Sequence, residues 1–391
     1  MVSKSLYNAI LVRPGEFMVR QGSVIRSFML SRLRESIIKT LKKRKHSFKT
    51  VNILEDTRII IYSENISEKL LYDIVRIFGI ASISPVKVLD YNLDLIIDTL
   101  SKFIEEDKPS SINLIVQGEH GYTSSVFKKI LASYLVDNYG VRIDLSEPAK
   151  TYYVEVRSGK AFITDTVLKG YGGLPYGVEG CMVSLSSGGV DSALATWYAL
   201  KRGVRVIIVF ISMYPYWSKK AIERFYESLN YIYEWVPWDY LKVYVINEMG
   251  SFIAKNASTL PSRLRCLACK ANMYRVASLI SKREGCKGIV TGEAIGQVAS
   301  QTANNLYVLS RLIDEPVYRP LIFKDKLEII EEAGKLGFSN LARDVGACRL
   351  KPVKPETSAS EEDLELLRKW LLETNNEVLE ILDHAEVMYY R

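Results

Sequence analysis

The segment Ser187-Gly188-Gly189-Val190-Asp191-Ser192 constrains the fold and chemistry of this chain more than any other feature. An apolar run, Cys181 to Leu185, precedes it and is typical of a buried strand, and a helical pattern begins at Ala193. Two adjacent glycines allow a tight turn that points successive backbone N–H groups at one anion. Ser187 and Ser192 add hydroxyl donors, and the N-terminus of the following helix favours negative charge at the same point. The order strand, loop, helix therefore predicts a phosphate-binding site.

The type of loop narrows the expected nucleotide chemistry. No lysine follows the glycines, so this is not a Walker loop, whose lysine reaches the β- and γ-phosphates. The pattern resembles the PP-loop of ATP pyrophosphatases, which split ATP into AMP and pyrophosphate in order to adenylate a substrate. A plain glycine turn before a helix is the alternative interpretation, and the flanking strand and helix argue against it.

Strands and helices alternate along the C-terminal half of the chain. We expect strands at 181–185, 204–211, 243–246 and 288–291, with helices between them. Such alternation predicts a doubly wound parallel sheet with helices on both faces, and thus an α/β domain. Ligands of these sheets bind beyond the carboxyl ends of the strands, where the loop after Leu185 and the turn Thr291-Gly292-Glu293 both fall.

The N-terminal half is predicted to be α+β. A strand, a long helix and two strands come first, and further helices, strands and a hairpin follow. The segment 169–177, Lys-Gly-Tyr-Gly-Gly-Leu-Pro-Tyr-Gly, is rich in glycine and is predicted to be an interdomain linker.

Positive charge is concentrated near the N-terminus. The net charge is +7, and residues 1–60 contribute +9 from 13 Lys and Arg against 4 Asp and Glu, so the rest of the chain sums to −2. Charge clusters are often only solvated faces, but one region that carries the whole positive balance is typical of binding to a nucleic-acid backbone. The candidate RNA-binding residues are Arg13 and the end of a predicted helix, Lys42, Lys43, Arg44 and Lys45.

The five cysteines are an odd number, which argues against a disulfide framework in a chain of this size. Cys266 and Cys269 form a C-x-x-C motif at a predicted helix start among basic residues, and such surroundings lower thiol pKa values. A zinc site, a redox-active dithiol and an iron–sulfur cluster with Cys348 as third ligand all remain open. Cys181 and Cys286 lie at the edges of apolar strands and are predicted to be core thiols.

The ordered combination of motifs resembles the tRNA 4-thiouridine synthetases (tRNA uridine 4-sulfurtransferases, the ThiI family) over nearly the whole chain. The markers are Ile10-Leu11-Val12-Arg13, Ser82-Ile83-Ser84-Pro85-Val86, Gly172-Gly173-Leu174-Pro175, the PP-loop, Thr291-Gly292-Glu293 with Gly296-Gln297-Val298-Ala299-Ser300-Gln301, and Arg319-Pro320-Leu321. The resemblance implies an N-terminal ferredoxin-like domain (1–62), a THUMP domain that grips the tRNA acceptor end (63–168), a linker (169–177) and a PP-loop ATP pyrophosphatase domain (178–391).

The resemblance also implies roles for individual residues. Asp191 and Lys326 match the catalytic aspartate and lysine, and Cys348 matches the cysteine of the catalytic domain. Cys266 and Cys269 occur as in archaeal-type members, which are thought to hold an iron–sulfur cluster with the third cysteine. The implied cofactors are ATP, Mg²⁺ and a [4Fe-4S] or [3Fe-4S] cluster. The candidate ATP contacts are Leu185, Ser186, Ser187, Gly188, Gly189, Asp191, Ser192, Phe210, Ile211, Lys270, Gly292 and Gln301.

Together these residues predict a two-step reaction on tRNA. ATP adenylates the C4 oxygen of a uridine, expected at position eight from the family, and sulfur then displaces AMP to give 4-thiouridine. With a three-cysteine cluster, hydrosulfide at the open iron is the nucleophile. Without one, Cys348 carries a persulfide and Cys266 or Cys269 resolves the disulfide. We favour the cluster, because C-x-x-C plus one remote cysteine leaves an iron free. Many bacterial members carry an additional C-terminal rhodanese domain, and we expect none in this chain.

Other functions stay open on the sequence. The chain could adenylate a small molecule or another nucleobase and hold zinc, could be a non-catalytic RNA-binding module, or could supply sulfur for thiamine thiazole synthesis. The expected partners are tRNA, a sulfur donor (sulfide or a cysteine desulfurase persulfide) and a second copy in a homodimer. We find no apolar stretch long enough to cross a membrane and no signal-peptide pattern, and we therefore expect a cytoplasmic protein.

Overall fold

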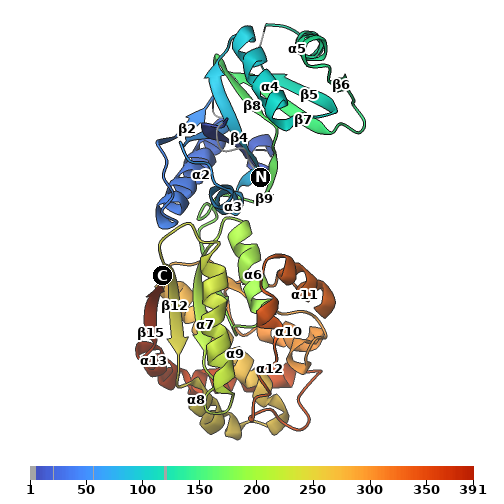
Figure 1. Cartoon of the computed structure of the whole chain (residues 1–391). Coiled ribbons are helices and arrows are strands. Elements are labelled where there is room, and N and C mark those ends of the chain that lie inside the picture. The colour runs from blue at the N-terminus through green and yellow to red at the C-terminus, as the bar shows by residue number, and fades with distance from the viewer. Residues whose placement is uncertain (1–5, 21, 56, 119–120) are drawn as a thin grey trace. The chain divides into compact units, whose positions relative to one another are not determined.

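The computed structural model describes residues 6–20, 22–55, 57–118 and 121–391 (Figure 1). The chain divides between Pro175 and Tyr176 into two compact units, which we call the N-terminal unit and the C-terminal unit. Within the described ranges, no helix combines the length and the apolar character needed to span a bilayer.

The N-terminal unit begins with a βαββαβ pattern. Its four strands lie in the order β2-β3-β1-β4 with antiparallel neighbours, which is the arrangement of a ferredoxin-like fold. Leu30, Leu33, Ile37 and Leu41 are buried at helical spacing, so this face of the long helix packs on the core. The elements are β1 (Ala9–Pro14), α1 (Phe17–Arg20), α2 (Ser23–Lys43), β2 (Thr50–Leu54), β3 (Arg58–Tyr62), α3 (Glu68–Val75) and β4 (Ile80–Asp90).

The same sheet continues through the rest of this unit in the order β4-β8-β7-β5-β6, and β9 pairs with β4. β7 and β8 form a hairpin whose turn residues, Ser158 and Gly159, both have positive φ angles. The elements are α4 (Leu93–Asp107), β5 (Ser111–Gly118), α5 (Ser124–Tyr139), β6 (Arg142–Ile143), β7 (Lys150–Arg157), β8 (Lys160–Thr164) and β9 (Leu168–Gly172).

β4 joins both halves of the N-terminal unit in one sheet. Its residues 80–86 pair with β1, whereas residues 87–90 pair with β8. α3 and β4 therefore complete the first fold, although the sequence places its end at residue 62. The structure also differs from the expected linker at residues 169–172, which form part of strand β9. Gly170 permits this pairing, since a Cβ there would lie only 2.3 Å from Ile80 O.

The C-terminal unit contains the predicted doubly wound sheet, with strand order β14-β13-β10-β11-β12-β15. The first five strands are parallel, and β15 pairs antiparallel with β12. β10 has β11 on one side and β13 on the other, so its carboxyl end is the topological switch point. The strands are β10 (Cys181–Leu185), β11 (Arg205–Ile211), β12 (Leu241–Ile246), β13 (Ile289–Val290), β14 (Val317–Tyr318) and β15 (Glu386–Tyr390).

Helices surround this sheet in Figure 1. α9 contributes much of the core beneath β10, with Leu267, Ala271 and Tyr274 fully buried. The helices are α6 (Val190–Lys201), α7 (Lys219–Tyr233), α8 (Met249–Asn256), α9 (Arg265–Arg283), α10 (Ala303–Ser310), α11 (Lys326–Lys335), α12 (Glu361–Glu373) and α13 (Asn375–Asp383), with 3₁₀ turns at 257–259, 262–264, 299–301 and 339–342.

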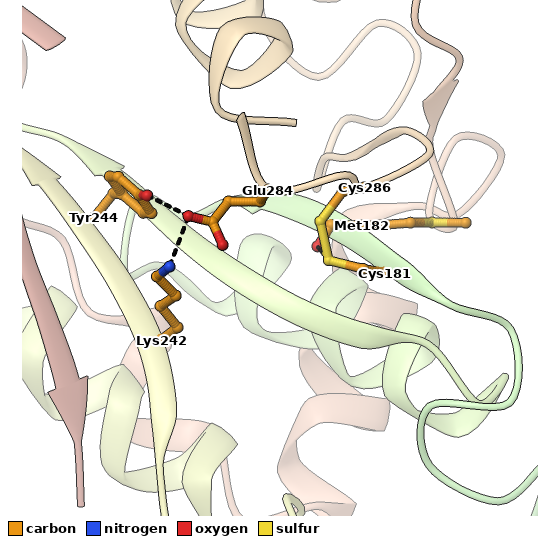
Figure 2. Close-up of a disulfide and its surroundings, with 6 residues drawn as sticks. All are labelled: Cys181, Met182, Lys242, Tyr244, Glu284 and Cys286. Carbon is orange, nitrogen blue, oxygen red and sulfur yellow. Dashed lines mark hydrogen bonds and ion pairs between the residues drawn. A yellow bond between two sulfur atoms is a disulfide. The ribbon is translucent and has the colours of Figure 1, made fainter. Parts of the chain in front are cut away.

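A disulfide joins Cys181 and Cys286, so the prediction of two core thiols is wrong (Figure 2). Cys181 opens β10 and Cys286 follows α9, and a backbone hydrogen bond from Lys287 N to Cys181 O holds the two segments together. The two residues are 105 positions apart, so their pairing depends on a tertiary contact that a cysteine count does not contain. Because Cys181 begins β10, the disulfide lies at the opposite end of this strand from the switch point. The free cysteines are Cys266, Cys269 and Cys348.

Candidate functional site

The loop after β10 turns into the N-terminus of α6 at the switch point. The hydroxyl oxygens of Ser186 and Ser187 accept hydrogen bonds of 3.3 Å from the backbone N–H groups of Gly188 and Gly189. Ser192 Oγ donates to Gly189 O at 2.9 Å. The N-cap of α6 is Gly189, and none of the described side chains caps the helix. The first N–H groups of α6 are therefore open to an anion.

Glycines allow three segments to meet at this loop. Gly188 has a φ of +73°, and a Cβ on it would lie 2.4 Å from Phe225 Cα of α7. Phe225 in turn stacks on Phe210 of β11, with ring centroids 4.1 Å apart. A Cβ on Gly292 would lie 2.5 Å from the carbonyl carbon of Asp191, so the loop after β13 also packs on the start of α6. Side chains at Gly188 or Gly292 would push these segments apart.

Asp191 and Lys326 form an ion pair beside the loop. Lys326 Nζ lies 2.7 and 2.8 Å from the two carboxylate oxygens of Asp191. Asp325 and Glu328 form a capping box that fixes the start of α11, and Lys326 is the first residue of that helix. The two side chains are 27% and 44% exposed, so the pair stabilises the fold by less than about 1 kcal/mol. The structure thus brings the two candidate catalytic residues together where their charge acts on a bound ligand.

A pocket of about 230 Å³ lies at the carboxyl ends of β10, β11 and β13. The candidate ATP contacts in its wall are Leu185, Ser186, Ser187, Asp191, Ser192, Phe210, Ile211, Lys270, Gly292 and Gln301. Gly188, Gly189 and Lys326 lie outside the wall. Thr291 and Glu293, from the turn that the sequence places at the carboxyl end of a strand, also line the wall. Sequence reasoning missed Val209, Met273 and Tyr274, because they sit in a strand and a helix whose apolar patterns resemble core, and no motif marked Trp217.

Glu293 is the buried anion of this pocket. Its carboxylate accepts hydrogen bonds from Tyr274 at 2.5 Å, from Arg319 Nε at 2.7 Å and from Thr291 at 2.9 Å. Lys270 Nζ forms a 2.6 Å ion pair with its other oxygen. Burial alone would raise the pKa of Glu293, but Lys270, Tyr274 and Arg319 outweigh it and hold the pKa at about 2. Glu293 thereby fixes Lys270 in the pocket wall. In the sequence, the Thr-Gly-Glu turn after a predicted strand was the feature that pointed to this residue.

The three free cysteines line a second cavity, of about 210 Å³. Cys266 and Cys269 are the second and fifth residues of α9, and Cys348 comes from the loop after the last 3₁₀ turn. Burial, with the nearby thiols, raises the pKa of Cys269 to about 12, and burial likewise raises the pKa of Cys266. The predicted lowering of these thiol pKa values is therefore wrong, because desolvation of the thiolate exceeds the effect of the basic neighbours.

The cysteine cavity adjoins the pocket under the loop. Trp217, Lys270 and Met273 line both of them. Across the described ranges, no set of three His, Cys, Asp or Glu side chains is arranged to hold a metal ion. The thiols share a cavity without forming a closed ligand set.

Four of the candidate RNA-binding residues lie at one end of α2. Lys42 and Lys43 belong to its last turn, Arg44 is the C-cap, and Lys45 follows in the left-handed conformation with a φ of 57°. Lys42 and Lys45 are exposed. Arg44 is 4.0 Å from Asp73 of α3, so part of its charge is balanced within the unit.

Arg13 has different surroundings on β1. It donates to Ser84 Oγ at 2.9 Å and to Glu155 at 3.3 Å. Arg58 and Arg157 pair with the same buried carboxylate at 3.1 and 2.6 Å. Burial opposes the ionised form, but the three guanidinium groups lower the pKa of Glu155. Three cations around one anion leave a surplus of positive charge, and Arg13 is held in place by this cluster.

Comparisons with known proteins identify the family of this chain. The family model described as "Thiamine biosynthesis protein (ThiI)" matches residues 177–371. A "Probable tRNA sulfurtransferase" of Methanosarcina mazei is 32% identical and covers 97% of this chain and 95% of its own length. A protein of the same name in Methanothermobacter thermautotrophicus is 31% identical, and the match covers 91% of this chain and 92% of that protein.

A solved structure extends the likeness to three dimensions. It is titled "Crystal structure of a 4-thiouridine synthetase - RNA complex with bound ATP", with a TM-score of 0.86, 25% identity, and coverage of 98% of this chain and 100% of that one. The sequence similarity extends over nearly the full length of both proteins, and both units take part in it. The chain belongs to the ThiI family of tRNA sulfurtransferases.

Proposed function

We propose that this chain uses ATP to convert a uridine of tRNA, at position eight, to 4-thiouridine. The observation that carries the proposal is the shared wall of Trp217, Lys270 and Met273 between two cavities. One cavity offers the groups of an ATP site, and the other offers three thiols. The neighbour in the structure comparison is a 4-thiouridine synthetase with RNA and ATP, which supports both ligands for this chain.

In the first step, the C4 oxygen of the uridine attacks the α-phosphorus of ATP. The bond from this phosphorus to the β-phosphate oxygen breaks, and its electron pair leaves with pyrophosphate. The open N–H groups of α6 and the hydroxyls of Ser187 and Ser192 are suited to hold that pyrophosphate. Lys326 offsets negative charge that develops at the reacting phosphate. Asp191 orients the Lys326 ammonium through its two contacts.

The donor chemistry of this site fits Mg²⁺. Nucleotide sites bind Mg²⁺ through one or two carboxylates together with phosphate oxygens. Asp191 is the suitable carboxylate of the pocket, because its side chain is partly exposed, whereas Glu293 is buried and held by Lys270, Arg319 and Tyr274. When bound, the ion would neutralise part of the triphosphate charge.

In the second step, sulfur replaces the activated oxygen. Sulfide adds to C4, the C4–O bond breaks, and the oxygen leaves on AMP. ATP, sulfide and uridine thus give 4-thiouridine, AMP and pyrophosphate without a net redox change. We assign the thiols of Cys266, Cys269 and Cys348 as ligands of an iron–sulfur cluster, which would supply an iron site for sulfide. The three sulfur donors suit iron, and they would have to lose their protons and close together on binding.

Metal and sulfide analysis of anaerobically purified protein tests the cluster. We expect iron and acid-labile sulfide in the wild type and their loss in Cys348→Ser. The matched control is the double variant Cys181→Ser/Cys286→Ser, which removes two cysteines outside the cavity and should keep the cluster. Iron-free protein that thiolates tRNA would overturn the cluster and favour a persulfide on Cys348. Stoichiometric zinc would favour the zinc alternative.

Anaerobic incubation with unmodified tRNA, ATP and sulfide tests the reaction itself. We expect 4-thiouridine in the nuclease digest and one AMP for each thiolated base. A tRNA with cytidine at position eight should give neither product. Rapid AMP formation without tRNA would instead indicate a small-molecule substrate.

A further inference from the structure

Arg224 of α7 lies against the phosphate loop and has no role in the reaction described above. We propose that Arg224 is a positioning residue that holds the Gly188-Gly189 turn and supplies positive potential for the β- and γ-phosphates of ATP. The inference rests on the proposed ATP site and adds a residue to it. No sequence motif pointed to this position.

The guanidinium of Arg224 packs directly on the backbone of the loop. A Cβ on Gly189 would lie 3.2 Å from Arg224 Nη2 and 3.5 Å from its Cζ. The next residue, Phe225, makes the close approach to Gly188, so two successive residues of α7 hold the two glycines. Arg224 Nη1 donates to Arg343 O at 2.8 Å, which fixes the far side of the guanidinium. Any movement of Arg224 would therefore shift the turn.

Arg224 is also an incompletely satisfied buried cation. It is 8% exposed, and its Nε has no hydrogen-bond partner among the residues that the structure describes. Burial, then the like charge of Arg343, lowers the pKa of Arg224, whereas Asp191 and Asp344 raise it. A buried N–H without a partner destabilises a protein, and an apolar side chain would fill the same space without that cost. A phosphate group of ATP bound at the neighbouring loop would explain why the buried residue at this position is an arginine.

The adenylation step gives this charge a specific target. As the bond between the α-phosphorus and the bridging oxygen breaks, negative charge moves onto the departing pyrophosphate. A cation at the back of the loop, at low dielectric, attracts that charge more strongly than one in solvent. AMP has no β- or γ-phosphate, so it gains little from Arg224. We therefore expect loss of the Arg224 charge to weaken the binding of pyrophosphate and ATP and to leave the binding of AMP nearly unchanged.

Calorimetric binding of inorganic pyrophosphate and of AMP tests the inference, together with kcat and KM for ATP. In Arg224→Met we expect affinity for pyrophosphate to fall about tenfold or more while AMP affinity stays within about twofold. Arg224→Lys, which keeps the charge, should recover part of the loss. Lys220→Met is the matched control, because it removes an exposed cation from the same helix and should leave both affinities unchanged.

The outcomes separate this inference from the proposed function. Wild-type affinity for pyrophosphate in Arg224→Met would overturn it, and so would equal losses of AMP and pyrophosphate binding, which indicate a purely structural role. If Arg224→Met does not fold, Arg224→Lys decides: lower pyrophosphate affinity with unchanged AMP affinity supports the inference, and unchanged values for both overturn it. If the wild type binds neither ATP nor pyrophosphate, the ATP site itself is wrong.

Discussion

Asp191 and Lys326 are 135 residues apart in the sequence and meet because α6 and α11 both begin beside the phosphate loop. Burial decides the chemistry of other single residues. Glu293 stays ionised among four donors, whereas the thiols of Cys266 and Cys269 stay protonated although basic residues flank them. At the residue scale, the surroundings in space therefore determine ionisation more than the neighbours in sequence do.

Replacement of Lys326 tests its placement at the reacting phosphate. We expect Lys326→Met to lower kcat for thiolation by about a hundredfold or more, because a preorganised charge is lost. The exposed ion pair contributes little to folding, so the melting temperature should hardly change. Lys335→Met, at the other end of α11, is the control, since Lys335 pairs with Glu331 in solvent. Equal rates for wild type and Lys326→Met would exclude Lys326 from the chemistry.

The low pKa of Glu293 predicts an acid-dependent loss of stability. Its folded-state pKa is held at about 2, below the ordinary value of 4.5, so the ionised form stabilises the fold above pH 4.5. As the pH falls from 4.5 towards 2, this contribution, on the order of 3 kcal/mol, is lost. Melting temperatures measured between pH 2.5 and 7 check this.

Two variants give the comparison for that pH dependence. Glu293→Gln should be less stable at pH 7 and should lose less stability in acid than the wild type. Glu331→Gln removes an exposed carboxylate and should follow the wild-type curve. Parallel curves for wild type and Glu293→Gln would show that Glu293 is not the titrating group.

At the scale of elements, the packing of neighbouring segments decides whether a basic side chain is exposed and what structure a glycine-rich segment forms. Lys42 and Lys45 at the basic end of α2 are exposed, but Arg13 is held by the Glu155 cluster on β7. The glycine-rich stretch predicted as a linker forms β9 in its first part, because Gly170 lets it approach Ile80. A glycine pattern shows that a close backbone approach is possible and does not show which segment makes it.

The exposed lysines at the end of α2 give a test of the RNA surface. We expect Lys42→Gln/Lys45→Gln to weaken tRNA binding and to reduce the slope of log K against log salt by about 1 to 2, because fewer counterions are released. Filter binding across a series of salt concentrations measures both. Lys255→Gln/Lys369→Gln removes two exposed lysines of the C-terminal unit as the control. An unchanged slope in the α2 variant would place the RNA elsewhere.

At the scale of the whole molecule, the two units combine different kinds of fold. The N-terminal unit is built around one continuous sheet, and the C-terminal unit is built around a doubly wound sheet with its switch point at β10. The Cys181–Cys286 disulfide ties the start of β10 to the end of α9, away from the ligand end of the strand. The disulfide and the ligand site thus lie at opposite ends of β10.

The disulfide should therefore stabilise the protein without affecting its activity. The disulfide closes a loop of 105 residues and so lowers the conformational entropy of the unfolded chain. This raises the free energy of unfolding by up to about 4–5 kcal/mol. We expect Cys181→Ser/Cys286→Ser to melt at a lower temperature and to thiolate tRNA at the wild-type rate well below that temperature. Thermal unfolding with and without reductant gives the same comparison in the wild type. A variant that is folded but inactive would link the disulfide to the site.

The sequence by itself determined the class of each fold and the position of the phosphate loop, because both follow from local patterns: hydrophobic periodicity, paired glycines and a helix start. Only the tertiary structure decided the Cys181–Cys286 pairing, the Glu293 network, the burial of Cys269 and the position of Arg224 behind Gly189. Each of these depends on segments that are distant in the chain. Their distances and desolvation arise only when the sheet and helices pack together, so no local pattern encodes them.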